Sequence, residues 1–429
     1  MSSPEIRKTD LAIIGSGMAG ISAAAFALKR GISFIQVGQT SELSFSSGCL
    51  DLFSVLPGQT PQFFPQPFEG LPELTAKYPG HPYDLAGREH IEKGFEAFIS
   101  FMKTLGIEYH VQPGNNQFII TPAGTLKPTY AVPGSMLAGA RAVQERQAIL
   151  IVDIRGLKGF GARQMALGLE SQLPEVRSAT VEFPGREGAG DLMCERLTWD
   201  LEKPEILTEF SNRILPHVKD AEAVGLPAIL GIYRFDELRH KIEALLGTRV
   251  FEIPTLAPSV TGMRMKEAFL GRLSTLGITH FSASVKKIDM DREKNFVFNI
   301  TQGMNRIEIQ TPFLLLATGR FMGRGLGAEN GRIKENLFDL PVTQAEDRGQ
   351  WFSRDFFDPR GHGVNRAGIE TDDQFRPLKK KNTVFHPRLY AAGSILAHQD
   401  WKREKTGAGI SIASAHKAVS HIARELGLS

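Results

Sequence analysis

Near its amino-terminal end the chain alternates between apolar runs and a stretch of small residues. Asp10–Ile14 is almost entirely apolar and predicts a short buried strand. Met18–Arg30 is rich in alanine and predicts a helix that ends at Gly31, and Ser33–Val37 predicts a second strand. A strand, a helix and a strand in this order predict the start of a right-handed βαβ unit in a parallel sheet.

The same alternation continues along the chain. Proline-rich residues 57–82 predict irregular structure, and the apolar spacing of Glu89–Leu105 predicts a helix. The other predicted elements are strands at Phe118–Thr121, Tyr130–Val132, Ala148–Ile154, Ala228–Ile232, Val250–Ile253, Ile278–Phe281 and Phe313–Ala317, helices at Ala162–Leu173, Asp236–Leu246 and Ser259–Leu276, and a polar meander over Val285–Asp289, Asn295–Ile300 and Arg306–Gln310.

This order of elements predicts an α/β fold, a Rossmann-like doubly wound domain with a β-meander and an inserted second α/β domain. At roughly 100–200 residues per domain, 429 residues suggest two or three domains. We assign residues 1–56 and 255–429 to one discontinuous nucleotide-binding domain. Residues 57–254 are assigned to the insert, as a cap or partner domain.

Composition and charge exclude several classes of function. The 50 Lys and Arg residues nearly balance the 47 Asp and Glu residues, so a net charge of +3 offers no basic surplus for nucleic acid. The two cysteines, Cys49 and Cys194, are too few for a disulfide framework, a four-cysteine zinc site or an iron–sulfur cluster within this chain. We expect no nucleic-acid partner and no metal site.

The uncharged stretch Leu11–Leu28 follows two basic residues and resembles a signal peptide or a membrane span. Its apolar character comes largely from Gly, Ala and Ser, which is weak for a span of about 20 strongly apolar residues. We therefore expect a cytoplasmic protein without a membrane span of its own.

A complete G-x-G-x-x-G motif joins the first strand to the first helix: Gly15, Ser16, Gly17, Met18, Ala19 and Gly20. The first glycine permits a tight turn, the second lets the backbone approach a phosphate, and the third lets the helix pack on the strand. The helix N-terminus then faces the phosphate charge. We predict a dinucleotide or flavin phosphate here; the alternative is a turn that only packs the helix on the sheet.

The end of the second strand lacks the carboxylate that usually accompanies this motif. An Asp or Glu about twenty residues on normally binds the ribose hydroxyls. Here Val37, Gly38 and Gln39 stand at this point, and no carboxylate comes before Glu42. Gln39 or Thr40 is left to make a weaker contact with a cofactor.

Small hydroxyl residues follow at once. Ser46 and Ser47, beside Gly48, are candidates to donate hydrogen bonds to phosphate or flavin ring oxygens. A serine-rich loop without a ligand is the alternative. Cys49 next to them is either a redox thiol or a small buried apolar residue.

Two later segments add to the cofactor hypothesis. An apolar strand ends at Ala317, Thr318 and Gly319, and another ends at Gly393 and Ser394. The last helix opens with Gly407, Ala408, Gly409 and Ile410. Such a helix start can direct amide groups at the pyrimidine oxygens of a flavin and stabilise negative charge on the reduced ring.

Together these segments resemble the flavoproteins with two dinucleotide-binding domains, the group that contains glutathione reductase and succinate dehydrogenase. Across nearly its whole length the chain also looks like the B subunit of anaerobic glycerol-3-phosphate dehydrogenase. The segments that carry this second resemblance are Phe45–Leu52, His81–Tyr83, Pro254–Val260, Asp355–Phe357 and Thr371–Pro377.

The resemblance implies a flavoprotein that works with two partners, a catalytic A subunit plus an iron–sulfur C subunit, and that is peripherally attached to the inner membrane through them. The complex would oxidise sn-glycerol 3-phosphate to dihydroxyacetone phosphate and pass electrons to quinone. The family is usually assigned FMN, which agrees with the missing strand-end carboxylate. FAD is the alternative, because Val285 lies where related FAD proteins hold adenine through backbone groups.

Candidate substrate residues are Arg264, Arg376 and His362. Arginine offers fork-like donors and permanent charge for a substrate phosphate, and a histidine can act as a base. Ion pairs for the two arginines and a loop position for the histidine are the alternatives. No proton acceptor is needed here if electrons only pass through the flavin.

Two other roles stay open beside the predicted flavin relay in a heteromeric complex. The chain can be a flavin-free scaffold that joins its partners, which the missing carboxylate favours. It can also be an independent soluble flavin dehydrogenase or reductase, which fits the motifs without the family resemblance.

Overall fold

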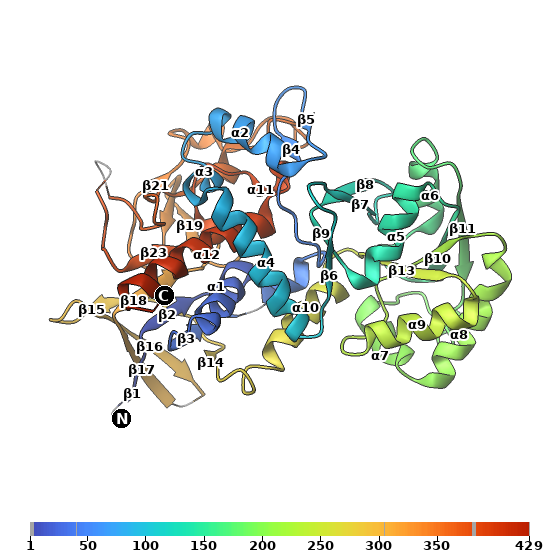
Figure 1. The fold of residues 1–429 in the computed structure, drawn as a ribbon, viewed down its shortest axis with the longest axis horizontal. Coiled ribbons are helices and arrows are strands. Elements are labelled where there is room, and N and C mark those ends of the chain that lie inside the picture. Colours follow the sequence, from blue (N-terminus) through green and yellow to red (C-terminus); the bar gives the residue numbers. More distant parts are fainter. Residues whose placement is uncertain (1–3, 40, 304, 380–382, 429) are drawn as a thin grey trace. The chain divides into compact units, whose positions relative to one another are not determined.

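The structure of the protein is a computed structural model that describes residues 4–39, 41–303, 305–379 and 383–428 (Figure 1). The chain forms two compact units. The first unit comprises Met1–Glu42, Asp51–Thr104 and Gly271–Ser429, and the second comprises Leu43–Leu50 and Leu105–Leu270. Residues 57–104, which the sequence pattern places in the insert, therefore belong to the first unit.

The core of the first unit is a parallel sheet in the order β14-β3-β2-β18-β23. Its strands are β14 (Thr279–Phe281), β3 (Phe34–Val37), β2 (Leu11–Ile14), β18 (Phe313–Leu316) and β23 (Leu389–Ala391). The three central strands are buried at every position, which explains their continuous apolar runs. The predicted Rossmann-like α/β fold is confirmed.

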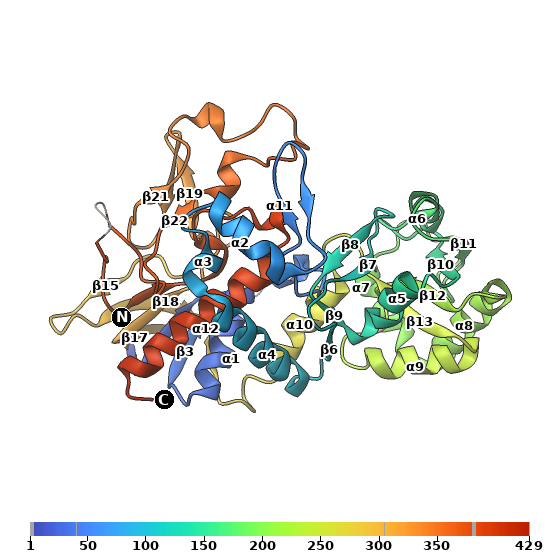
Figure 2. The same cartoon turned by 45° about the horizontal axis from the view of Figure 1, so that its top comes forward.

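Three helices pack together in this unit: α1 (Met18–Lys29), α4 (Arg88–Thr104) and α12 (Gly407–Glu425). Figure 2 shows α12 lying along both α1 and α4, and α1 also contacts β2 and β3. Alanine dominates α1, which is buried from Ala19 to Ala27, because small side chains let it lie between the sheet and another helix.

The predicted meander forms a second sheet, β1-β17-β16-β15. The strand expected at Val285–Asp289 is wrong, since the structure has only a short strand that begins at Asp289. The bounds are β1 (Glu5–Lys8), β15 (Asp289–Met290), β16 (Phe296–Gln302) and β17 (Asn305–Thr311).

Residues 57–82 are more regular than their prolines predict. Pro67 and Pro82 each occupy a first helical position, where a missing N–H has no intrahelical acceptor to lose. The remaining helices and strands of this unit are β4 (Val55–Leu56), β5 (Gln62–Phe63), α2 (Pro67–Lys77), α3 (Pro82–Ala86), β19 (Leu326–Glu329), β20 (Arg332–Glu335), β21 (Val342–Thr343), β22 (Gly368–Ile369) and α11 (Trp401–Glu404).

The second unit is the predicted second α/β domain, built on a parallel sheet in the order β11-β10-β12-β13. The strand expected at Ala228–Ile232 is wrong, because the strand in this region comes earlier in the chain and ends at Pro227. The bounds are β6 (Tyr109–Val111), β7 (Gln117–Ile120), β8 (Leu126–Thr129), β9 (Ala131–Pro133), α5 (Gly134–Glu145), β10 (Ile149–Ile154), α6 (Ala162–Leu169), β11 (Val176–Val181), α7 (Cys194–Leu201), α8 (Pro204–Val218), β12 (Ala223–Pro227), α9 (Phe235–Leu246), β13 (Arg249–Ile253) and α10 (Val260–Leu270).

Two histidines meet where α4 packs on α12. The Nδ1 atoms of His90 and His416 lie 3.0 Å apart, and Nε2 of His416 lies 3.3 Å from Nη2 of Arg30. Burial, and then the charges of Arg30 and His90, lower the pKa of His416 to about 3. Burial, and then the charge of Lys417, lower the pKa of His90 to about 4. Both rings are therefore neutral in the folded protein at pH 7.

We expect the two histidines between α4 and α12 to make the stability of the folded protein fall in acid. Below about pH 6.5 the unfolded chain binds protons that the folded chain excludes, so the free energy of unfolding falls as the pH drops towards the lowered pKa values. For His416 the loss between pH 7 and pH 5 is about 2 kcal/mol. Urea unfolding at both pH values should show a smaller loss for His416→Gln than for the wild type. An equally steep loss in both proteins would contradict this account.

Candidate functional site

The predicted cofactor segments of the first unit lie at one edge of its sheet. Because the strands are parallel, their carboxyl ends meet at that edge. Gly15 follows β2, Gly38 follows β3, Ala317 follows β18 and Gly393 comes just after β23. Backbone hydrogen bonds extend the pairing past the strands, from Gly15 N to Val37 O (2.7 Å), from Ala317 N to Ile14 O (2.8 Å) and from Ala392 N to Leu316 O (2.9 Å).

The first and third glycines of the motif are required by close backbone approach. Gly15 has a φ of +124°, and a Cβ there would lie 2.1 Å from the carbonyl oxygen of Ala317. A Cβ on Gly20 would lie 2.0 Å from the carbonyl oxygen of Gly15. These two glycines therefore let the turn lie on the end of β18 and let α1 lie on the turn.

The start of α1 is open to an anion. Gly17 is its N-cap, with no side chain to accept the first amides, and the first turn carries no acidic residue. The amides of Met18 and Ala19 have no acceptor within the helix. An uncapped helix start with its positive dipole end is a favourable place for a phosphate.

The end of β23 and the helix α12 contact the same turn of α1. A Cβ on Gly393 would lie 2.6 Å from the Cβ of Ala19, and the amide of Gly393 donates to Ser414 Oγ of α12 (2.9 Å). The first turn of α12 also lacks an acidic residue, and Thr406 at its N-cap makes no side-chain capping bond. Two helices with open N-termini thus belong to one packed region.

Some backbone amides at the start of α12 already donate to protein carbonyls, and others do not. The amide of Gly409 donates to the carbonyl of Asp51 (2.8 Å), so this residue is engaged by the protein itself. Gly407, Ala408 and Ile410 belong to the same turn, in which the amide of Ile410 already donates to Thr406 O (2.9 Å). The amides of Gly407 and Ala408 are the ones left for a ligand.

Residues after β18 are partly enclosed. Gly319 has a φ of +67°, and Thr318 Oγ1 is buried without a hydrogen-bond partner among the residues that the structure describes. A Cβ on Gly325 would lie 2.4 Å from that hydroxyl. The chain folds over Thr318, while Ser394 follows Gly393 in a short 3₁₀ turn.

Sequence reasoning missed His280, which lies beside the glycine-rich turn. Its Nε2 is 3.0 Å from the hydroxyl of the buried Ser16. Burial lowers the pKa of His280, against a hydrogen bond with the Gly38 backbone that raises it. The signal lies only in the register of β14 next to β3, where His280 pairs with Gln36.

In the part of the chain that the structure describes, the region that an adenosine would contact has few polar side chains suited to bind it. Gln39 is exposed, Thr40 lies outside the described residues, and no carboxylate ends β3. Val285 lies half-buried in the loop that follows β14. The choice between FMN and FAD stays a prediction.

The predicted hydroxyl segment, Ser46, Ser47 and Gly48, lies in the second unit. It forms hydrogen bonds with other residues of that unit. Ser46 Oγ accepts from the amide of Gly48 (3.1 Å), and Ser47 O accepts from Thr261 Oγ1 (2.9 Å). Cys49 is buried in an apolar cluster, with its Sγ 3.8 Å from Met136 Sδ. This burial supports the small apolar role of the cysteine.

The family of the chain follows from its relatives. A family model described as "FAD binding domain" matches residues 10–410. The B subunit of anaerobic glycerol-3-phosphate dehydrogenase from Vibrio cholerae serotype O1 (strain M66-2) is 31% identical over 425 residues, which cover 96% of each chain. The chain belongs to this B-subunit family. The resemblance found in the sequence is thus confirmed.

Two further comparisons cover nearly the whole chain. The probable anaerobic glycerol-3-phosphate dehydrogenase B subunit of Halobacterium salinarum (strain ATCC 29341 / DSM 671 / R1) is 30% identical over 426 residues, covering 96% of this chain and 97% of that one. A crystal structure of 3-ketosteroid delta1-dehydrogenase from Sterolibacterium denitrificans is 11% identical with a TM-score of 0.46, and the match covers 97% of this chain and 100% of that one.

The residues of the first unit fit the flavin that the FAD binding domain family implies. The donor set at the edge consists of backbone amides at the open start of α1, with no carboxylate in the first turn to repel a phosphate. This chemistry suits the phosphate that FMN and FAD share. It supports flavin binding without distinguishing the two.

The side chains of Arg376 and His362 each form hydrogen bonds to residues close to them in the sequence. Arg376 Nε donates to Asp372 Oδ2 (2.8 Å) across one turn of chain. His362 Nδ1 accepts from the amide of Ser353 (3.0 Å), so its Nε2 carries the proton and donates to the carbonyl of Phe356 (3.1 Å). These contacts give no support for a role of either residue in binding a substrate.

Arg264 is not available as a substrate ligand in this structure. The side chain is 4% exposed in the second unit and forms an ion pair with the equally buried Glu252. Nε donates to the carbonyl of Gly231 (2.7 Å), and the guanidinium lies 4.6 Å from the ring of Phe235. These contacts engage all three guanidinium nitrogens, and we assign the side chain a structural role.

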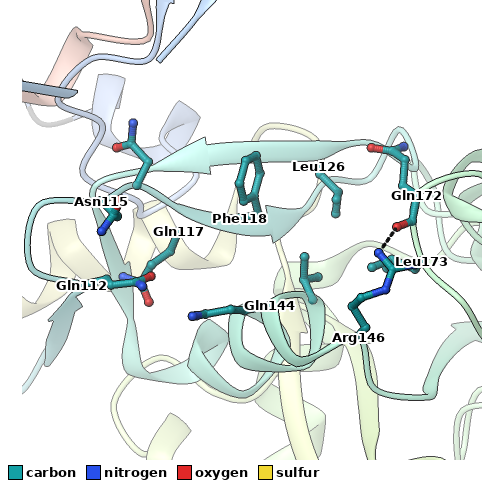
Figure 3. A pocket seen from close by; sticks show the side chains of 11 residues that line it. Gln112, Asn115, Gln117, Phe118, Leu126, Gln144, Arg146, Gln172 and Leu173 are labelled. Atoms are coloured by element: carbon teal, nitrogen blue, oxygen red, sulfur yellow. Dashed lines mark hydrogen bonds between the residues drawn. The ribbon is translucent and has the colours of Figure 1, made fainter. Parts of the chain in front are cut away.

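One cavity of about 370 Å³ lies in the second unit, between β7, β8 and α5 (Figure 3). Amide side chains dominate its lining, with Arg146 at one end. None of the predicted site residues lines it. Among the described residues, no cluster of His, Cys, Asp and Glu could hold a metal, and no helix is long and apolar enough to cross a membrane.

We expect Arg264→Met to lower the free energy of unfolding by about 3–5 kcal/mol, because it leaves the Glu252 charge buried without its partner. The matched variant Arg376→Met breaks a more exposed pair and should cost about 1 kcal/mol or less. Urea unfolding of both variants measures the difference. Loss of substrate turnover in Arg264→Met with unchanged stability would restore the substrate role.

Proposed function

We propose that this chain is the flavin-carrying B subunit of an anaerobic glycerol-3-phosphate dehydrogenase. The complex oxidises sn-glycerol 3-phosphate to dihydroxyacetone phosphate and passes the electrons to quinone. The relatives' names support the substrate, and the family model supports the flavin. The observation that carries the proposal is the open start of α1 at the carboxyl edge of the sheet.

The residues of the chain have distinct roles in this proposal. The amides of Met18 and Ala19 bind the flavin phosphate, while Ser16 and Gly17 shape the turn before them. The amides of Gly407 and Ala408 lie at the flavin's pyrimidine end. When bound, the flavin supplies an electron acceptor that takes two electrons and releases them singly. FMN is the proposed form and FAD the alternative.

The proposal includes partner subunits that take the electrons from this chain. Two cysteines cannot ligate an iron–sulfur cluster, so electrons leave for another protein or a small acceptor. We propose that those partners are a catalytic A subunit plus an iron–sulfur C subunit, with the complex peripheral to the cytoplasmic side of the inner membrane. In this arrangement the chain relays electrons.

Flavin retention tests the site. Purified protein should show the flavin absorbance bands and release flavin on denaturation, and Gly17→Val should abolish retention while leaving the protein folded. The backbone of Gly17 has a φ of −80°, which valine can adopt, so the effect arises from its side chain blocking the phosphate. Gly161→Val is the matched control, since Gly161 is also a glycine N-cap with extended backbone, of α6, where the Asp153 carboxylate already accepts from the amide of Ala162 (3.2 Å). Wild-type flavin content in Gly17→Val would refute the phosphate position.

Stopped-flow mixing with glycerol 3-phosphate tests the relay. The isolated chain should show little reduction of its flavin and little glycerol-3-phosphate:quinone activity, and both should appear once the two partners are added. Rapid, full bleaching of the flavin by substrate alone would make this chain an independent dehydrogenase.

A flavin-free scaffold is the second candidate, and the end of β3 favours it. Gly38 and Gln39 stand where a ribose-binding carboxylate is usual. A scaffold would assemble with its partners yet contain no flavin under any purification condition, whereas the relay assembles with flavin bound.

A further inference from the structure

A fully buried carboxylate ties together the segment that leads into α12. Glu404 ends α11 and is 0% exposed. Its Oε1 accepts from the amide of Asp400 (2.8 Å) and from Arg366 Nη1 (3.1 Å). Its Oε2 accepts from His81 Nε2 (3.3 Å) and from Thr406 Oγ1 (3.3 Å). Two donors from the same segment, Asp400 and Thr406, and two from distant parts of the first unit, His81 and Arg366, thus converge on one side chain.

The tautomer of His81 follows from its two contacts. Its Nδ1 accepts from the amide of Tyr83 (3.1 Å), capping α3, so the proton lies on Nε2. Nε2 therefore donates to Glu404. The His81–Tyr83 segment, which stands out in the sequence, is explained by this bond between α3 and the end of α11.

Arg366 supplies the countercharge for Glu404. Its guanidinium lies 3.8 Å from the ring centre of Tyr78, which holds it in place by a cation–π contact. Burial would raise the pKa of Glu404, but the bonds from His81 and Asp400 and the charge of Arg366 hold this pKa below its ordinary value. Glu404 is therefore ionised at pH 7. Its negative charge is balanced by the positive charge of Arg366.

The same cluster fixes the first turn of α12 from two sides. Thr406, which donates to Glu404, is the N-cap of α12. On the other side Tyr83 donates to the carbonyl of Leu52 (2.5 Å), and a Cβ on Gly409 would lie 2.0 Å from the Tyr83 hydroxyl. The amide of Gly409 donates to Asp51. The turn cannot move without breaking these contacts.

We propose that Glu404 and His81 are positioning residues that hold the open N-terminus of α12 against the pyrimidine end of the flavin. This inference rests on the proposed function, which places a flavin there. A carboxylate buried two residues before the helix N-cap acts through the backbone that it holds, and neither residue needs to touch the flavin. Their effect is to keep the amides of Gly407 and Ala408 aimed at one place.

The consequence is a preference for reduced flavin. A helix N-terminus stabilises negative charge near it, and the reduced ring carries more of that charge than the oxidised one. If the first turn of α12 shifts, the reduced form loses more binding than the oxidised form. A tenfold loss of this preference lowers the two-electron midpoint potential by about 30 mV.

The test is a redox titration of full-length protein reconstituted with FMN, as wild type, Glu404→Gln and His81→Leu. Glu335→Gln is the matched control, because Glu335 is 2% exposed in the same unit and caps a turn through the amides of Leu337 and Phe338. Glu404→Gln also removes the charge that balances Arg366, which by itself favours the reduced ring. We therefore expect a roughly tenfold loss of preference for reduced FMN in His81→Leu, where no charge changes, a smaller loss in Glu404→Gln, and none in Glu335→Gln.

His81→Leu leaves the charge pair of Glu404 and Arg366 intact, so it decides the matter if Glu404→Gln does not fold. Unchanged potentials in both variants overturn the inference, as does an equal shift in Glu335→Gln. Failure of the wild type to take up either FMN or FAD instead refutes the proposed function, and this outcome is visible before any variant is made.

Discussion

The architecture of the first unit depends on one backbone contact, the approach of the β2–α1 turn to the end of β18. No side chain fits between Gly15 and the carbonyl of Ala317, and none fits between Gly20 and the carbonyl of Gly15. This packing brings α1 directly to the carboxyl edge of the sheet. An open helix start at a strand edge follows from it, and so does the phosphate site that we propose there.

The second constraint is the convergence of α1 and α12. Gly393 lies between them, close to Ala19 and bonded to Ser414, so the two helices share one seam. Neither helix carries an acidic residue in its first turn. Their dipoles therefore both remain available to a ligand with negative charge at two places, which describes a flavin phosphate and a reduced flavin ring.

Sequence reasoning succeeded where a residue type has one physical reason to stand at a position. The glycines of the G-x-G-x-x-G motif and the continuous apolar runs predicted the sheet and α1, whereas the family came from the resemblance of longer segments. It failed where tertiary contacts decide. Arg264 looks like a phosphate ligand until Glu252, twelve residues earlier, is seen to neutralise it. His280 and Glu404 gave no signal, because their partners lie far along the chain.

The central claim is that the flavin phosphate lies at the start of α1. An experimental structure of the purified chain with FMN tests it most directly. The account predicts density for the phosphate within hydrogen-bonding distance of the Met18 and Ala19 amides. Density for the phosphate anywhere else, or a fully folded chain that holds no flavin when saturated with FMN or FAD, would contradict it.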